Sequence, residues 1–231
     1  MNIRGLQKTT LLDYPGHVAS TIFTSGCNFR CPFCHNGELV LDPGALPPIP
    51  EEEVLAHLNK RRTVLDGVCI SGGEPTLDPD LTSFLAKVRE TGLSIKLDTN
   101  GYRPEVLRRV IDEGLVDYVA MDIKAGRGNY ANACGFPNID MAKIEESVGI
   151  LASSGIGHEF RTTCVKGLHS LEDFKDIAAW LPGDSLYFLQ DYKEGPTVIN
   201  PVYESFSVEE LEEFVRILKP AIPATVIRGC D

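Results

Sequence analysis

Short apolar segments rich in β-branched and aromatic residues alternate along the chain with longer amphipathic segments. Short apolar runs of this kind are typical of parallel strands, whose two faces are both buried. The pattern predicts strands at residues 18–24, 67–71, 94–99, 117–123, 158–165 and 185–190, with a seventh at 224–228.

The segments between these runs repeat their apolar residues at helical spacing. They predict helices at residues 51–61, 78–90, 104–113, 140–153, 171–181 and 207–218. The first places acidic residues before basic ones, which matches the helix dipole. In the last, Ser207 is followed three residues later by Glu210, the arrangement of a capping box.

Strand and helix alternate about six times, which implies parallel strands joined by right-handed crossovers. A closed TIM-type barrel has eight such units in about 250 residues. The 231 residues here predict an α/β fold, an incomplete TIM-type barrel of about six parallel βα units. We expect a single domain over residues 1–231, with a core at about 14–200 and a C-terminal helix and strand at 201–231. Chemistry should lie at the C-terminal ends of the strands.

Composition narrows the function further. Residues are 43% hydrophobic and 24% charged, which is ordinary for a globular protein. The formal charge of −11 disfavours a nucleic-acid partner. No apolar run approaches the roughly 18–20 residues of a membrane span, so we expect no membrane partner. The odd count of seven cysteines, three of them crowded into one loop, favours a cytoplasmic protein whose reduced thiols hold a metal.

The crowded cysteines follow the first predicted strand with C-x3-C-x2-C spacing, at Cys27, Cys31 and Cys34. Three thiolates can converge on one metal centre and leave a coordination position open. One interpretation adds His35 as a fourth ligand and gives a structural zinc site, although His35 directly adjoins Cys34. The other interpretation is a [4Fe–4S] cluster with three cysteine ligands and one iron without a protein ligand. Phe33 would then shield this cluster from water.

This spacing, with an aromatic residue just before the last cysteine, resembles the signature of the radical S-adenosylmethionine (SAM) enzymes. The strings LDYPG at 12–16 and FTSGCNFRCPFCHN at 23–36 are similar to a narrower group, the glycyl-radical-enzyme activases, and above all to the activating proteins of anaerobic ribonucleoside-triphosphate reductase. The resemblance runs from about residue 6 to at least residue 124.

The resemblance implies an oxidoreductase in which Cys27, Cys31 and Cys34 are catalytic and hold a [4Fe–4S] cluster. SAM is then cleaved reductively to methionine and a 5′-deoxyadenosyl radical, which removes a hydrogen from a glycine Cα of a partner enzyme. The implied partners are a glycyl-radical enzyme, namely anaerobic ribonucleotide reductase, and an electron donor of flavodoxin or ferredoxin type.

Polar motifs follow three further strands. Gly72, Gly73 and Glu74 form by themselves a tight turn, but two glycines also permit close backbone approach and the carboxylate suits an ammonium group. The resemblance implies that this turn holds the amino group of SAM. It also implies that Asp98, Thr99 and Asn100 border the SAM pocket, with Asp98 contributing to a cation site, and that Lys124 faces the SAM carboxylate with Asp122 in its polar surroundings. We also expect Arg161, on the fifth predicted strand, to contact SAM; the alternative is a surface ion pair.

Other features remain open. The stretch 189–193 lacks the histidine that activases of pyruvate formate-lyase carry there, which tilts the resemblance away from that enzyme. Cys69 and Cys164 are expected to be core residues, and the roles of Cys134, Cys230 and Lys193 stay unassigned. An open barrel side would admit a protein loop, whereas filling by residues 201–231 would favour a small substrate. Alternative functions are radical SAM chemistry on another glycyl-radical enzyme, a peptide or a small metabolite, and a zinc-stabilised binding module without catalysis.

Overall fold

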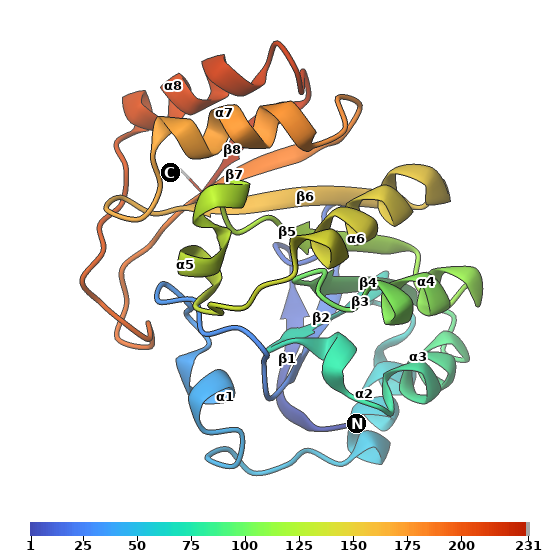
Figure 1. The fold of residues 1–231 in the computed structure, drawn as a ribbon. Helices are drawn as coiled ribbons and strands as arrows, with labels where there is room; N and C mark the ends of the chain where they lie inside the picture. The colour runs from blue at the N-terminus through green and yellow to red at the C-terminus, as the bar shows by residue number, and fades with distance from the viewer. Residues whose placement is uncertain (230–231) are drawn as a thin grey trace.

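The computed structural model describes residues 1–229, which form one curved sheet with helices packed against it (Figure 1). The eight strands follow the order β1 to β8, so every strand lies beside its neighbours in sequence. Strands β2 to β8 are parallel, and β1 pairs antiparallel with β2. Since β1 and β8 are the two edges and do not pair, the sheet is an incomplete barrel, as predicted.

All seven predicted strands are present, with ends shifted by at most two residues. They are β2 (Ala19–Thr24), β3 (Gly67–Gly72), β4 (Ser94–Thr99), β5 (Tyr118–Asp122), β6 (Gly157–Cys164), β7 (Tyr187–Asp191) and β8 (Thr225–Arg228). The edge strand β1 (Ile3–Thr10) was not predicted. Its exposed residues Gln7, Lys8 and Thr9 give it no apolar pattern, because it contributes little to the core.

The six predicted helices are also confirmed. They are α2 (Glu51–Arg61), α3 (Leu81–Arg89), α4 (Pro104–Asp112), α6 (Met141–Ser154), α7 (Leu171–Trp180) and α8 (Val208–Leu218). The predicted capping box at Ser207 and Glu210 begins α8. Four short elements were missed, since none spans two helical turns: α1 (Gly37–Leu41), α5 (Tyr130–Cys134), η1 (Pro75–Leu77) and η2 (Arg127–Asn129).

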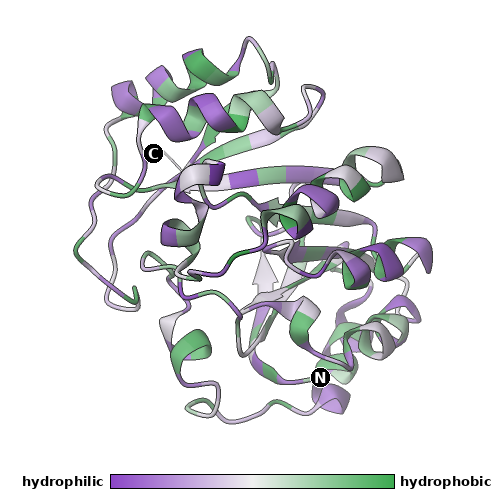
Figure 2. Cartoon of the chain, in the orientation of Figure 1, coloured by the Kyte–Doolittle hydropathy of each residue, from purple (hydrophilic) through white to green (hydrophobic). Residues whose placement is uncertain are grey.

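Hydrophilic and hydrophobic residues alternate along β6 (Figure 2), because the two faces of the sheet differ in polarity. In β4, Ile95 and Leu97 join the hydrophobic core with the helices, while Lys96 and Asp98 point to the opposite face. We call that opposite face, which the helices do not cover, the inner face. Across the sheet it presents polar and charged residues that pair with one another: Ser71, Lys96, Asp98, Asp122, Glu159, Arg161 and Arg228.

The C-terminal segment continues the sheet. Strand β8 pairs with β7, and α8 packs on α7 through the stacked rings of Phe174 and Phe214, whose centroids are 4.1 Å apart. This placement differs from the alternative in which residues 201–231 fill the barrel. Cys230 lies outside the described residues. Among residues 1–229, no helix combines the length and the apolar character that crossing a membrane requires.

Candidate functional site

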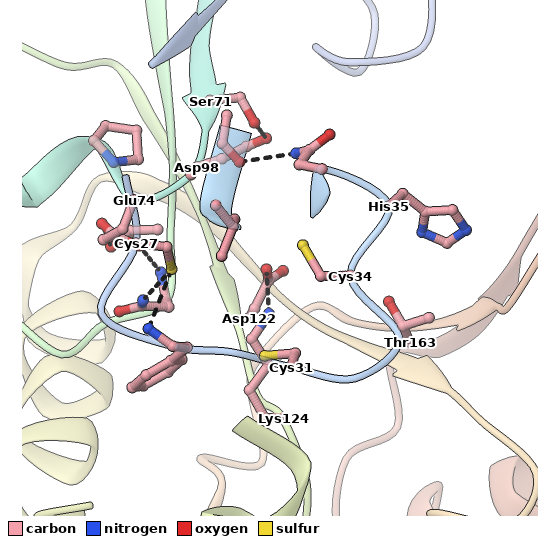
Figure 3. Close-up of a pocket in the computed structure, with 18 of the residues that line it drawn as sticks. Cys27, Cys31, Cys34, His35, Ser71, Glu74, Asp98, Asp122, Lys124 and Thr163 are labelled. Carbon is pink, nitrogen blue, oxygen red and sulfur yellow. Dashed lines mark hydrogen bonds and ion pairs between the residues drawn. The ribbon is translucent and has the colours of Figure 1, made fainter. Parts of the chain in front are cut away.

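A cavity of about 210 Å³ opens at the C-terminal ends of the strands (Figure 3). Every residue that the sequence singled out for the site lines it, from the ends of four strands, β3 to β6, and from the loop after β2. These residues are Cys27, Cys31, Phe33, Cys34, Gly72, Gly73, Glu74, Asp98, Thr99, Asn100, Asp122, Lys124 and Arg161. These residues therefore gather at the strand ends where the rule for parallel sheets expects the chemistry of such a fold.

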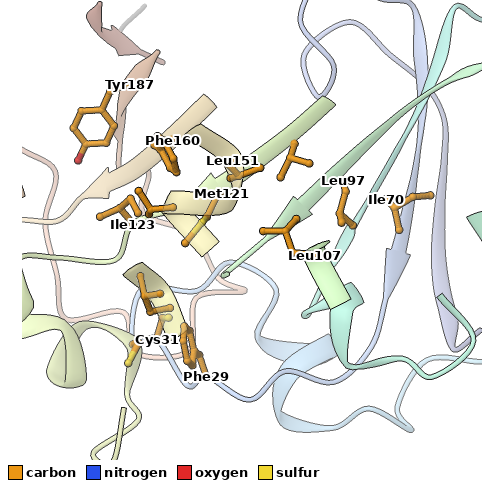
Figure 4. Close-up of a cluster of buried hydrophobic side chains, with 14 of the residues drawn as sticks. Phe29, Cys31, Ile70, Leu97, Leu107, Met121, Ile123, Leu151, Phe160 and Tyr187 are labelled. Carbon is orange, nitrogen blue, oxygen red and sulfur yellow. The ribbon is translucent and has the colours of Figure 1, made fainter. Parts of the chain in front are cut away.

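The cysteine loop joins β2 to α1 and turns its three thiols toward one space in Figure 3. All three cysteines are free, so no disulfide links them. Cys31 is 6% exposed and lies with Phe29 at the margin of the buried apolar cluster behind the loop (Figure 4). Burial raises the pKa of Cys27 to about 11 and that of Cys31 to about 12. Metal loading must therefore displace their protons.

A second loop, residues 192–206, is hydrogen-bonded to the cysteine loop. The amide of Ile199 donates to the Cys34 carbonyl at 3.1 Å, and the amide of Asn200 donates to the Pro32 carbonyl at 2.8 Å. The His35 ring contacts the Lys193 carbonyl, with 2.5 Å between Nε2 and O. This segment carries no sequence motif, so its support of the site could not be predicted from the sequence.

The contact with Lys193 turns His35 away from the thiols, as Figure 3 shows. The structure thus does not place His35 as a fourth zinc ligand. Within residues 1–229, no three His, Cys, Asp or Glu side chains gather at the spacing that one metal ion needs. Zinc–sulfur bonds are only about 2.3 Å long, whereas thiolates around a multi-iron cube stand farther apart. The three thiols therefore fit a cluster better than a single ion.

The glycine turn after β3 packs directly on the cysteine loop. A Cβ on Gly72, whose φ is +115°, would lie 2.3 Å from the Thr24 carbonyl oxygen. A Cβ on Gly73 would lie 2.0 Å from the carbonyl oxygen of Gly26, which accepts a hydrogen bond from the Glu74 amide at 2.8 Å. The close backbone approach that Gly72 and Gly73 allow is therefore an approach to the protein's own backbone, at Thr24 and Gly26.

Glu74 is 2% exposed and connects the ends of β3 and β4. Its Oε1 accepts from Thr76 N at 3.1 Å, Thr76 Oγ1 at 2.5 Å and Thr99 Oγ1 at 2.8 Å, while Oε2 accepts from Asn100 N at 2.6 Å. Burial raises the pKa of Glu74 even against these donors. Because Oε2 accepts one bond only, it retains acceptor capacity toward the cavity.

Two aspartates and two basic residues form an ion-pair network on the inner face. Arg161 contacts Asp122 at 2.9 Å and Asp98 at 3.5 Å, and Lys124 contacts Asp122 at 2.9 Å. Burial alone would raise the pKa of Asp122, but Arg161 and Lys124 hold it at about 2. Burial likewise opposes the charge of Lys124, and Asp122 raises its pKa well above the usual range. The network is therefore ionised at neutral pH.

Two supporting residues escaped the sequence analysis. Lys96, at 1% exposure, pairs with Asp98, so the cation beside Asp98 is the protein's own ammonium. The buried His169 contacts the Lys124 carbonyl through Nε2 at 2.7 Å and accepts from Val165 N through Nδ1 at 3.0 Å. Burial lowers the pKa of His169, so this ring is a neutral structural support. A lysine inside an apolar strand was the available signal for Lys96.

One buried polar group of the cysteine loop has no partner within the described residues. The side-chain oxygen of Asn28 accepts from Asn100 Nδ2 at 2.9 Å, but its own Nδ2 makes no hydrogen bond within residues 1–229. Buried donors of this kind usually find a partner. The orphaned amide, the thiols and the charged rim together fit a metal cluster with a polar, zwitterionic cosubstrate.

Comparison with known proteins agrees with this chemistry. The profile of the Radical SAM superfamily matches residues 21–181. A Methanocaldococcus jannaschii protein, provisionally named a glycyl-radical enzyme activating enzyme, is 31% identical over 98% of this chain and 95% of its own length. The pyruvate formate-lyase-activating enzyme of Clostridium pasteurianum is 32% identical over 53% of this chain and 52% of its own.

Solved structures share the fold at low identity. The crystal structure of Streptococcus suis SuiB bound to S-adenosylmethionine superimposes with a TM-score of 0.68 at 14% identity, and covers 88% of this chain. This chain spans 48% of the SuiB chain, about half of its length. The likeness concerns the partial barrel alone.

We predict that Gly73→Ala destabilises the protein by about 3 kcal/mol or more, because the new Cβ overlaps backbone and not a flexible side chain. Thermal unfolding measures the loss. Gly128→Ala is the matched control, since nothing lies within 4 Å of its Cβ position, and it should change stability by less than about 0.5 kcal/mol. Equal stability of the two variants would contradict the described contact.

The raised thiol pKa values predict slow alkylation of the metal-free protein. Between pH 7 and pH 10 the rate at Cys27 should rise about tenfold per pH unit, because only the thiolate reacts and its pKa is about 11. Iodoacetamide labelling followed by peptide mass spectrometry gives the rates. Free cysteine, with a pKa of about 8.5, is the control and levels off earlier. A plateau for Cys27 near pH 9 would contradict the burial argument.

Proposed function

Because this chain belongs to the radical SAM superfamily, with its [4Fe–4S] cluster and SAM, we propose that it is an activating enzyme that installs a glycyl radical on a partner enzyme. We further propose that the partner is anaerobic ribonucleoside-triphosphate reductase. The observation that carries the proposal is the end-to-end match to the M. jannaschii activating enzyme, which covers 95% of that protein.

The open sheet supports a macromolecular substrate. Strands β1 and β8 do not pair, so the barrel is not closed between them, and we infer that a loop of the partner enters there. A glycine Cα within a protein loop requires such an entrance, whereas a small metabolite does not. The second candidate, a radical SAM enzyme that acts on a peptide, has the support of the fold shared with the peptide-binding protein SuiB.

Each site residue receives a role under this proposal. Cys27, Cys31 and Cys34 hold the cluster and leave one iron free. When bound, the cluster supplies the single electron that cleaves SAM to methionine and a 5′-deoxyadenosyl radical. Oε2 of Glu74 accepts from the amino group, which its remaining acceptor capacity allows.

The other polar groups position the rest of SAM. Lys124 binds the carboxylate, and its ion pair with Asp122 keeps the ammonium in place. Arg161, Asp98, Thr99 and Asn100 border the same pocket. Phe33, 5% exposed and edge-to-face with His169, excludes water from the thiols. These residues orient and shield, while the cofactors supply the difficult chemistry.

We also propose a cytoplasmic location and an electron donor of flavodoxin or ferredoxin type. Three free thiols in one loop need a reducing compartment to remain available for a cluster. A low-potential one-electron donor matches the single electron that each SAM cleavage consumes.

The function is tested by mixing the anaerobically reduced protein and SAM with candidate glycyl-radical enzymes. Electron paramagnetic resonance should show a glycine-centred doublet with anaerobic ribonucleotide reductase, and its glycine→alanine variant serves as the control without the acceptor hydrogen. A doublet with a different glycyl-radical enzyme would refute the assigned partner. SAM cleavage without a doublet on any of them would favour a peptide or metabolite substrate.

Cys34→Ala tests the site itself. The variant should lose formation of 5′-deoxyadenosine completely, because two thiolates cannot hold the cluster with a single free iron. Cys164→Ala is the control, since Cys164 is fully buried in β6 and does not line the cavity. Chromatographic assay of 5′-deoxyadenosine reports both. Product from Cys34→Ala would refute the ligand assignment.

A further inference from the structure

Lys96 is a buried lysine, and burying its charged ammonium group costs desolvation free energy. It is 1% exposed and is among the largest fully buried side chains of residues 1–229. Its Nζ reaches the Asp98 carboxylate and lies 3.8 Å from Cys69 Sγ. Burial raises the pKa of Cys69 well above its usual value, so that thiol is neutral. Asp98 is thus the anion that balances Lys96.

Asp98 in turn depends on Lys96 as its nearest cation. Asp98 Oδ2 accepts from Ser71 Oγ at 2.9 Å, whereas Oδ1 is shared between Lys96 and the more distant Arg161 at 3.5 Å. Arg161 is held at 2.9 Å by Asp122. Lys96 is therefore the near cation of Asp98, and Arg161 is committed to the other aspartate.

We infer that the ion pair between Lys96 and Asp98 has a role beyond packing. A buried ion pair is seldom more stable than two apolar residues of the same size, so its presence points to a use for the charge. Asp98 lines the cavity, and Lys96 stands behind it on the side away from the cavity. Lys96, Lys124 and Arg161 together face the carboxylates of Asp98 and Asp122.

We propose that the Lys96 ammonium is a built-in counter-cation, a positioning residue that keeps Asp98 charged and turned toward the pocket without a free metal ion. The ammonium group of a lysine and a bound monovalent cation, such as NH₄⁺ or K⁺, place the same single positive charge beside a carboxylate. A methionine at position 96 keeps most of the aliphatic stem but ends one heavy atom short. Asp98 in Lys96→Met then faces a space that a small cation can occupy.

The experiment compares wild type with Lys96→Met, both anaerobically purified with the cluster, in ammonium, potassium or choline chloride at equal ionic strength. Choline is too large for the site. In choline the variant should melt about 10 °C lower, because it removes the nearest cation from the half-buried Asp98 carboxylate and leaves only the more distant Arg161. Ammonium or potassium should restore several degrees to the variant and leave wild type unchanged. Lys175→Met, which breaks an exposed pair with Glu172, is the control without a cation effect.

SAM affinity gives a second signal, which rests on the proposed function. In choline, Lys96→Met should bind SAM about tenfold more weakly, the scale of one charge-assisted contact, and recover in ammonium. If SAM does not bind wild type, the proposed function fails, while the melting comparison still tests the counter-cation.

A double variant, Lys96→Met with Asp98→Asn, covers the case in which the single variant does not fold. It removes both charges together, so it should fold and show no response to cations. A single variant whose melting temperature is the same in choline and ammonium would overturn the proposal. So would a double variant that responds to cations as the single variant does.

Discussion

The cysteine loop can present three thiols to one space only because other segments fix its backbone. The turn after β3 donates from Gly73 to Thr24 and from Glu74 to Gly26, the end of α5 accepts from Arg30, and the loop at 192–206 donates to Pro32 and Cys34. A loop this short has no regular structure of its own to satisfy its polar groups. Glycine is required where the turn meets the loop, since any side chain there would overlap backbone.

Charge on the inner face is the second element on which the site depends. The residues there alternate with the apolar residues that face the helices, so each strand serves the core and the cavity at once. The half-buried carboxylates of Asp98 and Asp122 each have a near cation, Lys96 and Arg161 respectively, which stabilises their charges. Positive groups in fixed positions suit a cosubstrate that brings a carboxylate, and they need no rearrangement when it binds.

Much of this could be predicted from the sequence because the strands are parallel and buried, and buried parallel strands are continuous apolar runs. The strand-end rule then brought distant motifs to one cavity. Edge strand β1 escaped because its exposed residues have no pattern. Lys96 escaped because a single polar residue in an apolar run does not reveal its partner, and His169 escaped because it lies in the loop between β6 and α7 without a motif. The supporting loop at 192–206 acts through its backbone amides, which no side-chain pattern records.

The proposed radical chemistry depends on a cluster that three thiolates hold, with one iron free for SAM. Iron analysis and electron paramagnetic resonance of the anaerobically reduced protein, recorded before and after addition of SAM, test this most directly. We predict about four irons per chain and a cluster signal that changes when SAM is added. A single zinc per chain, or an iron signal that SAM leaves unchanged, would contradict it.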